Sequence, residues 1–113
     1  MATLNAVQSP RFEGTELHYF VGDTFTLKLK VNLKKDGDEI PIGPEEEIWL
    51  EFYKSGVIVT KKVFRDIQDN TLEINWDEDT TKQFKKGDYV ARVVYCDSDY
   101  RRTILSNFGV CVE

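Results

Sequence analysis

The stretch TFTLKLKVNL, residues 24–33, alternates apolar and polar side chains over its whole length. The odd-numbered positions from Phe25 to Leu33 are Phe, Leu or Val, and the even-numbered positions are Thr, Lys or Asn. Successive side chains of a β-strand point to opposite faces of a sheet, so this pattern predicts a strand with one buried and one solvated face. Turn residues flank it, with Gly22-Asp23 before it and Asp36-Gly37 after it.

Further strands follow at short intervals along the chain. Residues 48–53 and 57–64 flank a Ser55-Gly56 turn and predict a hairpin, whose second strand carries Lys61-Lys62 and is expected at a sheet edge. Three more strands are expected, at residues 71–76, 89–96 and 102–112, and Tyr19-Phe20-Val21 is expected to close a strand that precedes residues 24–33. This spacing of strands and turns predicts an all-β fold, an immunoglobulin-like antiparallel β-sandwich of about seven to eight strands.

The helical content predicted from the sequence is one short turn near residues 78–84. Asp77 is placed to cap this turn, which would bring Phe84 into the core as a plug. Tyr89 follows Gly87 at the start of a late strand, as the tyrosine-corner residue does in immunoglobulin-type sandwiches.

The length and composition indicate one globular domain. A chain of 113 residues is long enough for one hydrophobic core, and 41% hydrophobic residues argue against disorder. We expect residues 16–113 to form a single β-sandwich domain and residues 1–15 to be an N-terminal arm or an extra edge strand. The net charge of −5 argues against nucleic-acid partners, and no apolar run approaches the roughly 20 residues that cross a bilayer. The start of the chain shows no signal-peptide pattern, so we expect synthesis in the cytoplasm.

Motifs that carry enzyme chemistry are not recognisable in the sequence. It shows no phosphate-binding loop, dinucleotide fingerprint, zinc-protease motif or nucleophile elbow. The single histidine, His18, lies near a strand start and is interpreted as structural. We therefore expect no catalytic residues, no cofactor and no metal site. Acidic clusters at residues 36–39 and 77–79 are interpreted as turn and capping residues; weak calcium binding there and a glycosidase-like carboxylate pair stay open.

The two cysteines flank one predicted hairpin that turns near Ser98-Asp99. Cys96 then lies opposite about Thr103, so Cys111 is eight residues further along the strand, on the order of 25 Å away. A disulfide needs Cα atoms within about 7 Å. We predict two free thiols, which favours a reducing compartment or a particle assembled inside the cell.

The strand pattern also predicts which side chains face the core. Burying Glu51 without a partner would be costly, so its strand is expected to direct Ile48, Leu50 and Phe52 inward. The two late strands are expected to direct inward Tyr89, Ala91, Val93, Tyr95, Ile104, Phe108, Val110 and Val112. Trp49, Tyr53, Val90, Val94, Cys96, Leu105 and Cys111 then point outward, so one sheet is predicted to be apolar on both faces.

Four sequence segments together resemble a known group of proteins: VGDTFTL at residues 21–27, KDG at 35–37, LEINW at 72–76 and FKKGDY at 84–89. The chain resembles, over most of residues 17–112, the small β-sandwich domains of tail and baseplate proteins from phages and prophages of Gram-positive bacteria, as in the N-terminal domain of baseplate upper proteins. The resemblance implies a virion component that is assembled in the cytoplasm and docks to neighbouring subunits, without catalytic residues. The two cysteines are a departure from that pattern.

We consider three functions. The first is a structural assembly module that contacts protein subunits, its own copies or other tail proteins, through an apolar sheet face; the candidate interface residues are Trp49, Tyr53, Val90, Val94 and Leu105. The second is a carbohydrate-binding module in which Trp49 and Tyr53 stack against sugar rings. The third is a small enzyme that uses acidic loop residues.

An alternative for the same face is that the N-terminal arm covers it. The apolar residues of the arm are Leu4, Val7 and Phe12.

Overall fold

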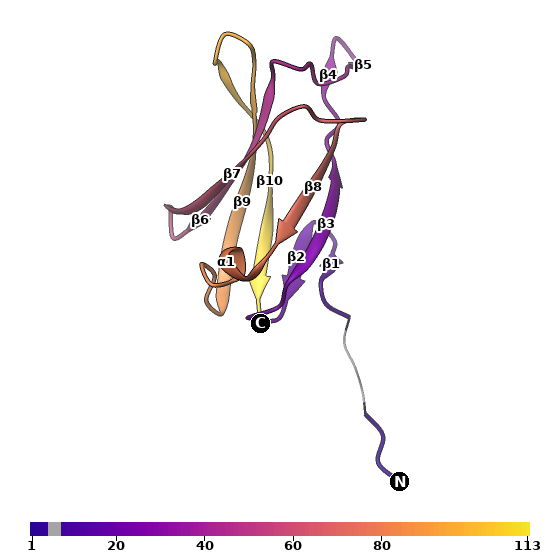
Figure 1. Cartoon of the computed structure of the whole chain (residues 1–113), viewed down its shortest axis with the longest axis vertical. Coiled ribbons are helices and arrows are strands. Elements are labelled where there is room, and N and C mark those ends of the chain that lie inside the picture. The colour runs from indigo at the N-terminus through magenta and orange to yellow at the C-terminus, as the bar shows by residue number, and fades with distance from the viewer. Residues whose placement is uncertain (5–7) are drawn as a thin grey trace.

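A computed structural model describes residues 1–4 and 8–113, which form two β-sheets packed against each other and a short two-stranded hairpin, β4-β5 (Figure 1). The large sheet has six strands in the spatial order β1-β2-β10-β9-β6-β7, and the small sheet pairs β3 with β8. The strands are β1 (Arg11–Glu13), β2 (Glu16–Tyr19), β3 (Phe25–Lys30), β4 (Lys34–Lys35), β5 (Asp38–Glu39), β6 (Glu47–Lys54), β7 (Val57–Phe64), β8 (Thr71–Trp76), β9 (Gly87–Cys96) and β10 (Arg102–Val112). The predicted all-β sandwich is confirmed.

The small sheet has the wet outer face that the alternation of residues 24–33 predicts. β3 and β8 run antiparallel with Leu27 opposite Ile74, and both side chains pack toward the large sheet. On the other side of this sheet Thr26 donates a hydrogen bond of 3.2 Å to Asn75. Two strands therefore bring a row of aliphatic side chains to the core and leave polar groups in solvent.

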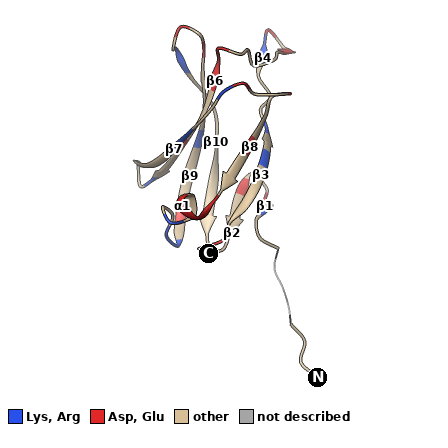
Figure 2. Cartoon of the chain, in the orientation of Figure 1, with Lys and Arg blue, Asp and Glu red and all other residues tan. Residues whose placement is uncertain are grey.

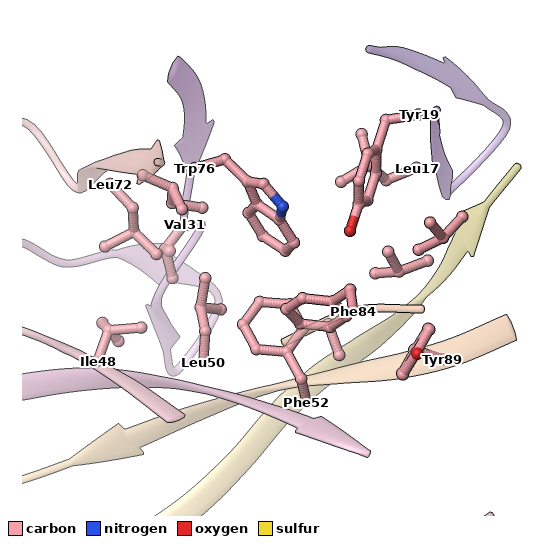
Figure 3. Packing of buried hydrophobic residues seen from close by; sticks show 14 of the residues in the cluster. Leu17, Tyr19, Val31, Ile48, Leu50, Phe52, Leu72, Trp76, Phe84 and Tyr89 are labelled. Atoms are coloured by element: carbon pink, nitrogen blue, oxygen red, sulfur yellow. The ribbon is translucent and has the colours of Figure 1, made fainter. Parts of the chain in front are cut away.

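Trp76, at the end of β8, is the centre of the core and connects the two sheets. Its ring centroid lies 5.4 Å from that of Tyr19 on β2, 5.4 Å from that of Phe52 on β6 and 4.9 Å from that of Phe84 (Figure 3). Aromatic side chains bury more apolar area than other residue types, and edge-to-face contacts between them are favourable. This cluster therefore holds β8 against the large sheet.

The predicted cap and tyrosine corner are both present. The Asp77 side chain accepts a hydrogen bond of 2.8 Å from the Thr80 backbone at the start of α1 (Glu78–Thr81), a shorter helix than the predicted turn. Two further turn hydrogen bonds lead the chain on to Phe84, which is buried as expected. The Tyr89 hydroxyl then accepts from the Lys85 N–H and donates to the Lys85 carbonyl, each at 2.9 Å. These contacts fix the loop between α1 and β9.

A β-bulge in β10 corrects the predicted orientation of two residues. Ile104 pairs with Val94 and Ser106 pairs with Val93, which leaves Leu105 as the extra residue. Strict alternation predicts Ile104 inward and Leu105 outward, but Leu105 packs against the core and Ile104 is 57% exposed. A bulge inserts one residue without a partner and so reverses the parity of the strand on one side of it.

Within the N-terminal segment, Arg11–Glu13 form a strand at the edge of the large sheet. β1 pairs antiparallel with β2, and the Phe12 ring lies 6.5 Å from that of Phe108 at the rim of the core. Leu4 is 93% exposed and covers neither sheet. Val7 lies outside the described residues. β7 is the opposite edge of the large sheet, as Lys61-Lys62 predicts.

Candidate interaction surface

The face of the large sheet that points away from β3 and β8, called here the outer face, carries apolar and charged side chains in alternating rows. Cross-strand partners share a face, so strand register defines each row. From β7 to β10, one apolar row contains Val63, Trp49, Val94 and Ile104, and the adjacent charged row contains Lys61, Glu51, Arg92 and Asn107. A second apolar row contains Ile58, Tyr53 and Val90.

The Trp49 indole is held between charged groups. Lys61 Nζ lies 4.2 Å from the ring centroid and the Arg102 guanidinium carbon lies 5.3 Å from it, both in range for cation–π attraction. The indole N–H donates a hydrogen bond of 2.9 Å to Glu47, which also pairs with Arg65. The Trp49 hydrogen bond, with Arg65, lowers the pKa of the Glu47 carboxyl below its usual value. Glu47 is therefore a carboxylate at neutral pH, and the indole is fixed in orientation.

Glu51 lies on the outer face, as expected, but is only 5% exposed. The sequence predicted that Glu51 would be solvated. In the structure it is buried on the outer face, where other side chains pair with its carboxylate. Arg102 donates to both Glu51 carboxylate oxygens, at 2.9 and 2.8 Å, and the Tyr53 hydroxyl donates to one of them at 3.2 Å. Arg92 in turn lies 4.7 Å from the Tyr53 ring centroid. A buried carboxylate is tolerated when it is paired and hydrogen-bonded, as here.

The five candidate interface residues do not all lie on an accessible surface. Trp49 and Tyr53 are half-buried on the outer face and Val90 is exposed there. Val94 points to the same face but is 0% exposed, because Trp49 and Ile104 flank it in its row. Leu105 lies on the inner face, as the bulge requires, so its assignment to the interface is wrong.

Sequence reasoning missed the apolar side chains that are most accessible on the outer face. Ile104, Val63 and Ile58 are all exposed large hydrophobic residues. The run Val57-Ile58-Val59 was a visible signal for β7, but no side chain in that strand was assigned to a face. The position of Ile104 depended on the bulge, which leaves no local pattern in the sequence.

The outer face is polarised in charge. Around β6, β7 and β9 it carries four cationic side chains and two carboxylates: Lys61, Arg65, Arg92 and Arg102 against Glu47 and Glu51. Around β1 and β2 it carries four carboxylates and one guanidinium: Glu13, Glu16, Asp88 and Glu113 against Arg11. Figure 2 shows the basic residues on β7. One end of the face is therefore cationic and the other anionic.

The two cysteines are free thiols, as predicted. Cys96 pairs with Arg102 at one end of the β9–β10 ladder and Cys111 pairs with Asp88 near the other, which keeps their sulfur atoms far apart. Burial raises the pKa of the Cys96 thiol. A thiol with a raised pKa is a poor nucleophile, so Cys96 is a packing residue.

Within the part of the chain that the structure describes, no helix combines the length and apolarity that a membrane crossing requires. Comparison of the chain with protein-family models, with curated protein sequences and with solved structures finds no match.

Proposed function

We propose that this chain is a non-enzymatic structural module that associates with a second copy of itself through the outer face. The observation that carries the proposal is the exposure of Ile104, Val63 and Val90 on one sheet face, in rows beside charged groups that already have partners. Several large apolar side chains exposed on one sheet face favour a contact site in a soluble protein. The Trp49 ring is already held by Lys61, Arg102 and Glu47, so less side-chain entropy is lost when it forms a contact.

The charge pattern of the face favours a second copy as the partner. In a face-to-face dimer a two-fold axis that lies between the sheets, parallel to the strands, places one end of each outer face over the opposite end of its partner. The cationic end around Lys61 and Arg92 then meets the anionic end around Glu13 and Glu16. Complementary charge of this kind speeds association and fixes the relative orientation of the subunits.

The setting of a phage tail or baseplate is part of this proposal and is supported by the sequence resemblance. Such particles assemble from repeated subunit contacts, which suits a module with a self-complementary face. The carbohydrate-binding alternative needs an open aromatic surface. The cations beside Trp49 and Tyr53 occupy the space in which a sugar ring would stack, so the observations favour assembly.

The test is sedimentation of the purified chain over a wide range of concentrations, with a chelator present to keep metal ions off the anionic end. The wild-type chain is expected to form a dimer, and higher salt is expected to weaken it, because screening reduces attraction between the charged ends. The double variant Ile104→Ser, Val63→Ser is expected to be a folded monomer. Circular dichroism reports whether the variant is folded.

Val21→Ser is the matched control, because Val21 is an exposed valine in the loop after β2 and not on the outer face. This variant should dimerise like the wild-type chain. A wild-type chain that stays monomeric at all concentrations, or a double variant that dimerises as well as the control, would refute the proposal.

A further inference from the structure

Residues from β1, β2, β9 and β10 meet at the anionic end of the outer face. His18 on β2 has Arg11 on β1 as its register partner on one side and Cys111 on β10 on the other. Cys111 is in turn opposite Asp88 on β9. Leu17, Tyr19 and Val110 next to these positions point into the core, so His18 and Cys111 both point to the outer face.

The atoms of three side chains in this group are close enough to share one metal ion. One ligand atom from each of Glu16, His18 and Cys111 lies within 4.8 Å of the other two. His18 Nε2 is 3.0 Å from Glu16 Oε1 and 3.2 Å from Glu13 Oε2. In a tetrahedral zinc site with bonds of about 2.0–2.3 Å, neighbouring ligand atoms are roughly 3.3–3.8 Å apart. Glu16, His18 and Cys111 therefore need only small rearrangements to bind one ion, and Glu13 lies beside His18 Nε2.

From this geometry we infer that the chain binds a zinc ion through His18, Cys111 and Glu16, with Glu13 as the fourth ligand. A set of one nitrogen, one sulfur and two carboxylate oxygens is the chemistry that zinc accepts. Calcium and magnesium prefer oxygen ligands alone, so they are excluded from this set.

The charge balance and the burial of His18 support a cation at this position. Four carboxylates face the site, Glu13, Glu16, Glu113 and Asp88, and Arg11 is the fixed cation beside them. A divalent ion compensates this excess of negative charge and binds the thiolate directly.

His18 is only 9% exposed, and its Nδ1 atom is buried without a hydrogen-bond partner. Nδ1 lies 3.9 Å from Glu113 Oε1. With zinc on Nε2, a small shift of the ring or of Glu113 would let Nδ1–H donate to this carboxylate, the hydrogen bond that orients metal-binding histidines in proteins.

Gly109 on β10 leaves room for the Glu16 ligand. A Cβ atom added at Gly109 would lie 3.0 Å from both Cγ and Oε2 of Glu16, a tighter contact than side chains normally make. The absence of a side chain lets the Glu16 carboxylate lie flat over the sheet beside His18. The zinc ion would connect β1, β2 and β10 and so hold the N-terminal hairpin to the sandwich.

The test is titration of the reduced chain with zinc alone by calorimetry, and with cobalt(II) alone by absorption spectroscopy. Wild-type protein should bind one equivalent of zinc, and cobalt should give the near-ultraviolet sulfur-to-metal band and the intense visible bands of a tetrahedral thiolate site. Cys111→Ser should remove the sulfur band and weaken zinc binding by more than about tenfold, and Gly109→Ala should weaken it by about tenfold without removing a ligand.

Cys96→Ser is the matched control, since Cys96 lies at the other end of the ladder, and it should bind like the wild-type chain. The inference is overturned if wild-type protein gives no sulfur band, or if Cys111→Ser binds zinc as tightly as Cys96→Ser. At the same zinc concentration the Tm should also rise more for wild-type protein than for Cys111→Ser, so an unchanged wild-type Tm at saturating zinc would count against the site.

Discussion

Replacing Tyr89 with Phe removes one oxygen atom and both hydrogen bonds of the tyrosine corner. The hydroxyl bonds the N–H and the carbonyl of Lys85 at 2.9 Å each, and each bond contributes about 0.5–1.5 kcal/mol net. Lys85 is exposed, so water replaces part of the lost bonding. We therefore expect Tyr89→Phe to lower the free energy of unfolding by about 1–2 kcal/mol, and the Tm by roughly 4–8 °C for a chain of this size.

Urea denaturation followed by tryptophan fluorescence measures this change, because Trp76 lies in the core against Phe84, the ring that Tyr89 touches. Tyr100→Phe is the control. It removes the same atom from an exposed turn in which the tyrosine makes only a backbone hydrogen bond with Asp97. A loss for Tyr89→Phe below about 0.5 kcal/mol, or one equal to the control, would show that the corner does not stabilise the α1–β9 loop.

Two further predictions concern the bulge and the helix cap. Leu105→Thr should lower the free energy of unfolding by about 1–3 kcal/mol and Ile104→Thr by less than about 0.5 kcal/mol, measured by urea denaturation; the reverse order would mean that the strand has no bulge. The pKa of Asp77 is lowered by the hydrogen bond from the Thr80 N–H. The charged side chain therefore stabilises the folded state at pH values above the unfolded pKa of about 4. This stabilisation is lost as the pH falls through the pKa of the folded state. Asp77→Asn should therefore have a lower Tm than wild-type protein at pH 7 and an equal Tm in strong acid, and a Tm difference independent of pH would contradict the capping role.

The strands were predictable from the sequence wherever one face is buried and the other is wet. Residues 24–33 and 71–76 show this alternation clearly, and their inward side chains are those that pack in the core. Asp77 and Tyr89 were predictable for a different reason, since a cap and a corner depend on residues close in sequence. Local geometry is encoded locally, so these features need no knowledge of distant strands.

The features that failed depend on partners far away in the chain. Glu51 can be buried because Arg102, 51 residues later, supplies its counter-ion. Ile104 and Leu105 are adjacent apolar residues, and the sequence does not show which of them faces the core. The pairing of β10 with β9 decides this. The approach of His18 to Cys111 was not predicted, because Cys111 belongs to the last strand, which pairs in parallel with β2. Spacing within one segment cannot reveal such a pairing.

Both proposed activities use the outer face, and the reason lies in the unequal sheets. The two-stranded sheet packs on the inner face of the six-stranded sheet. The hydrophobic core is therefore formed by the inward side chains of the two sheets. The outward side chains of the large sheet do not contribute to this core and form the charged rows. Arg102, which is paired with Glu51, also contacts the Trp49 ring and fixes its position in the unbound chain. A face ordered in advance loses little entropy on binding. The same rigidity brings His18 and Cys111 to the spacing that a metal ion needs, because β-strand register sets their separation.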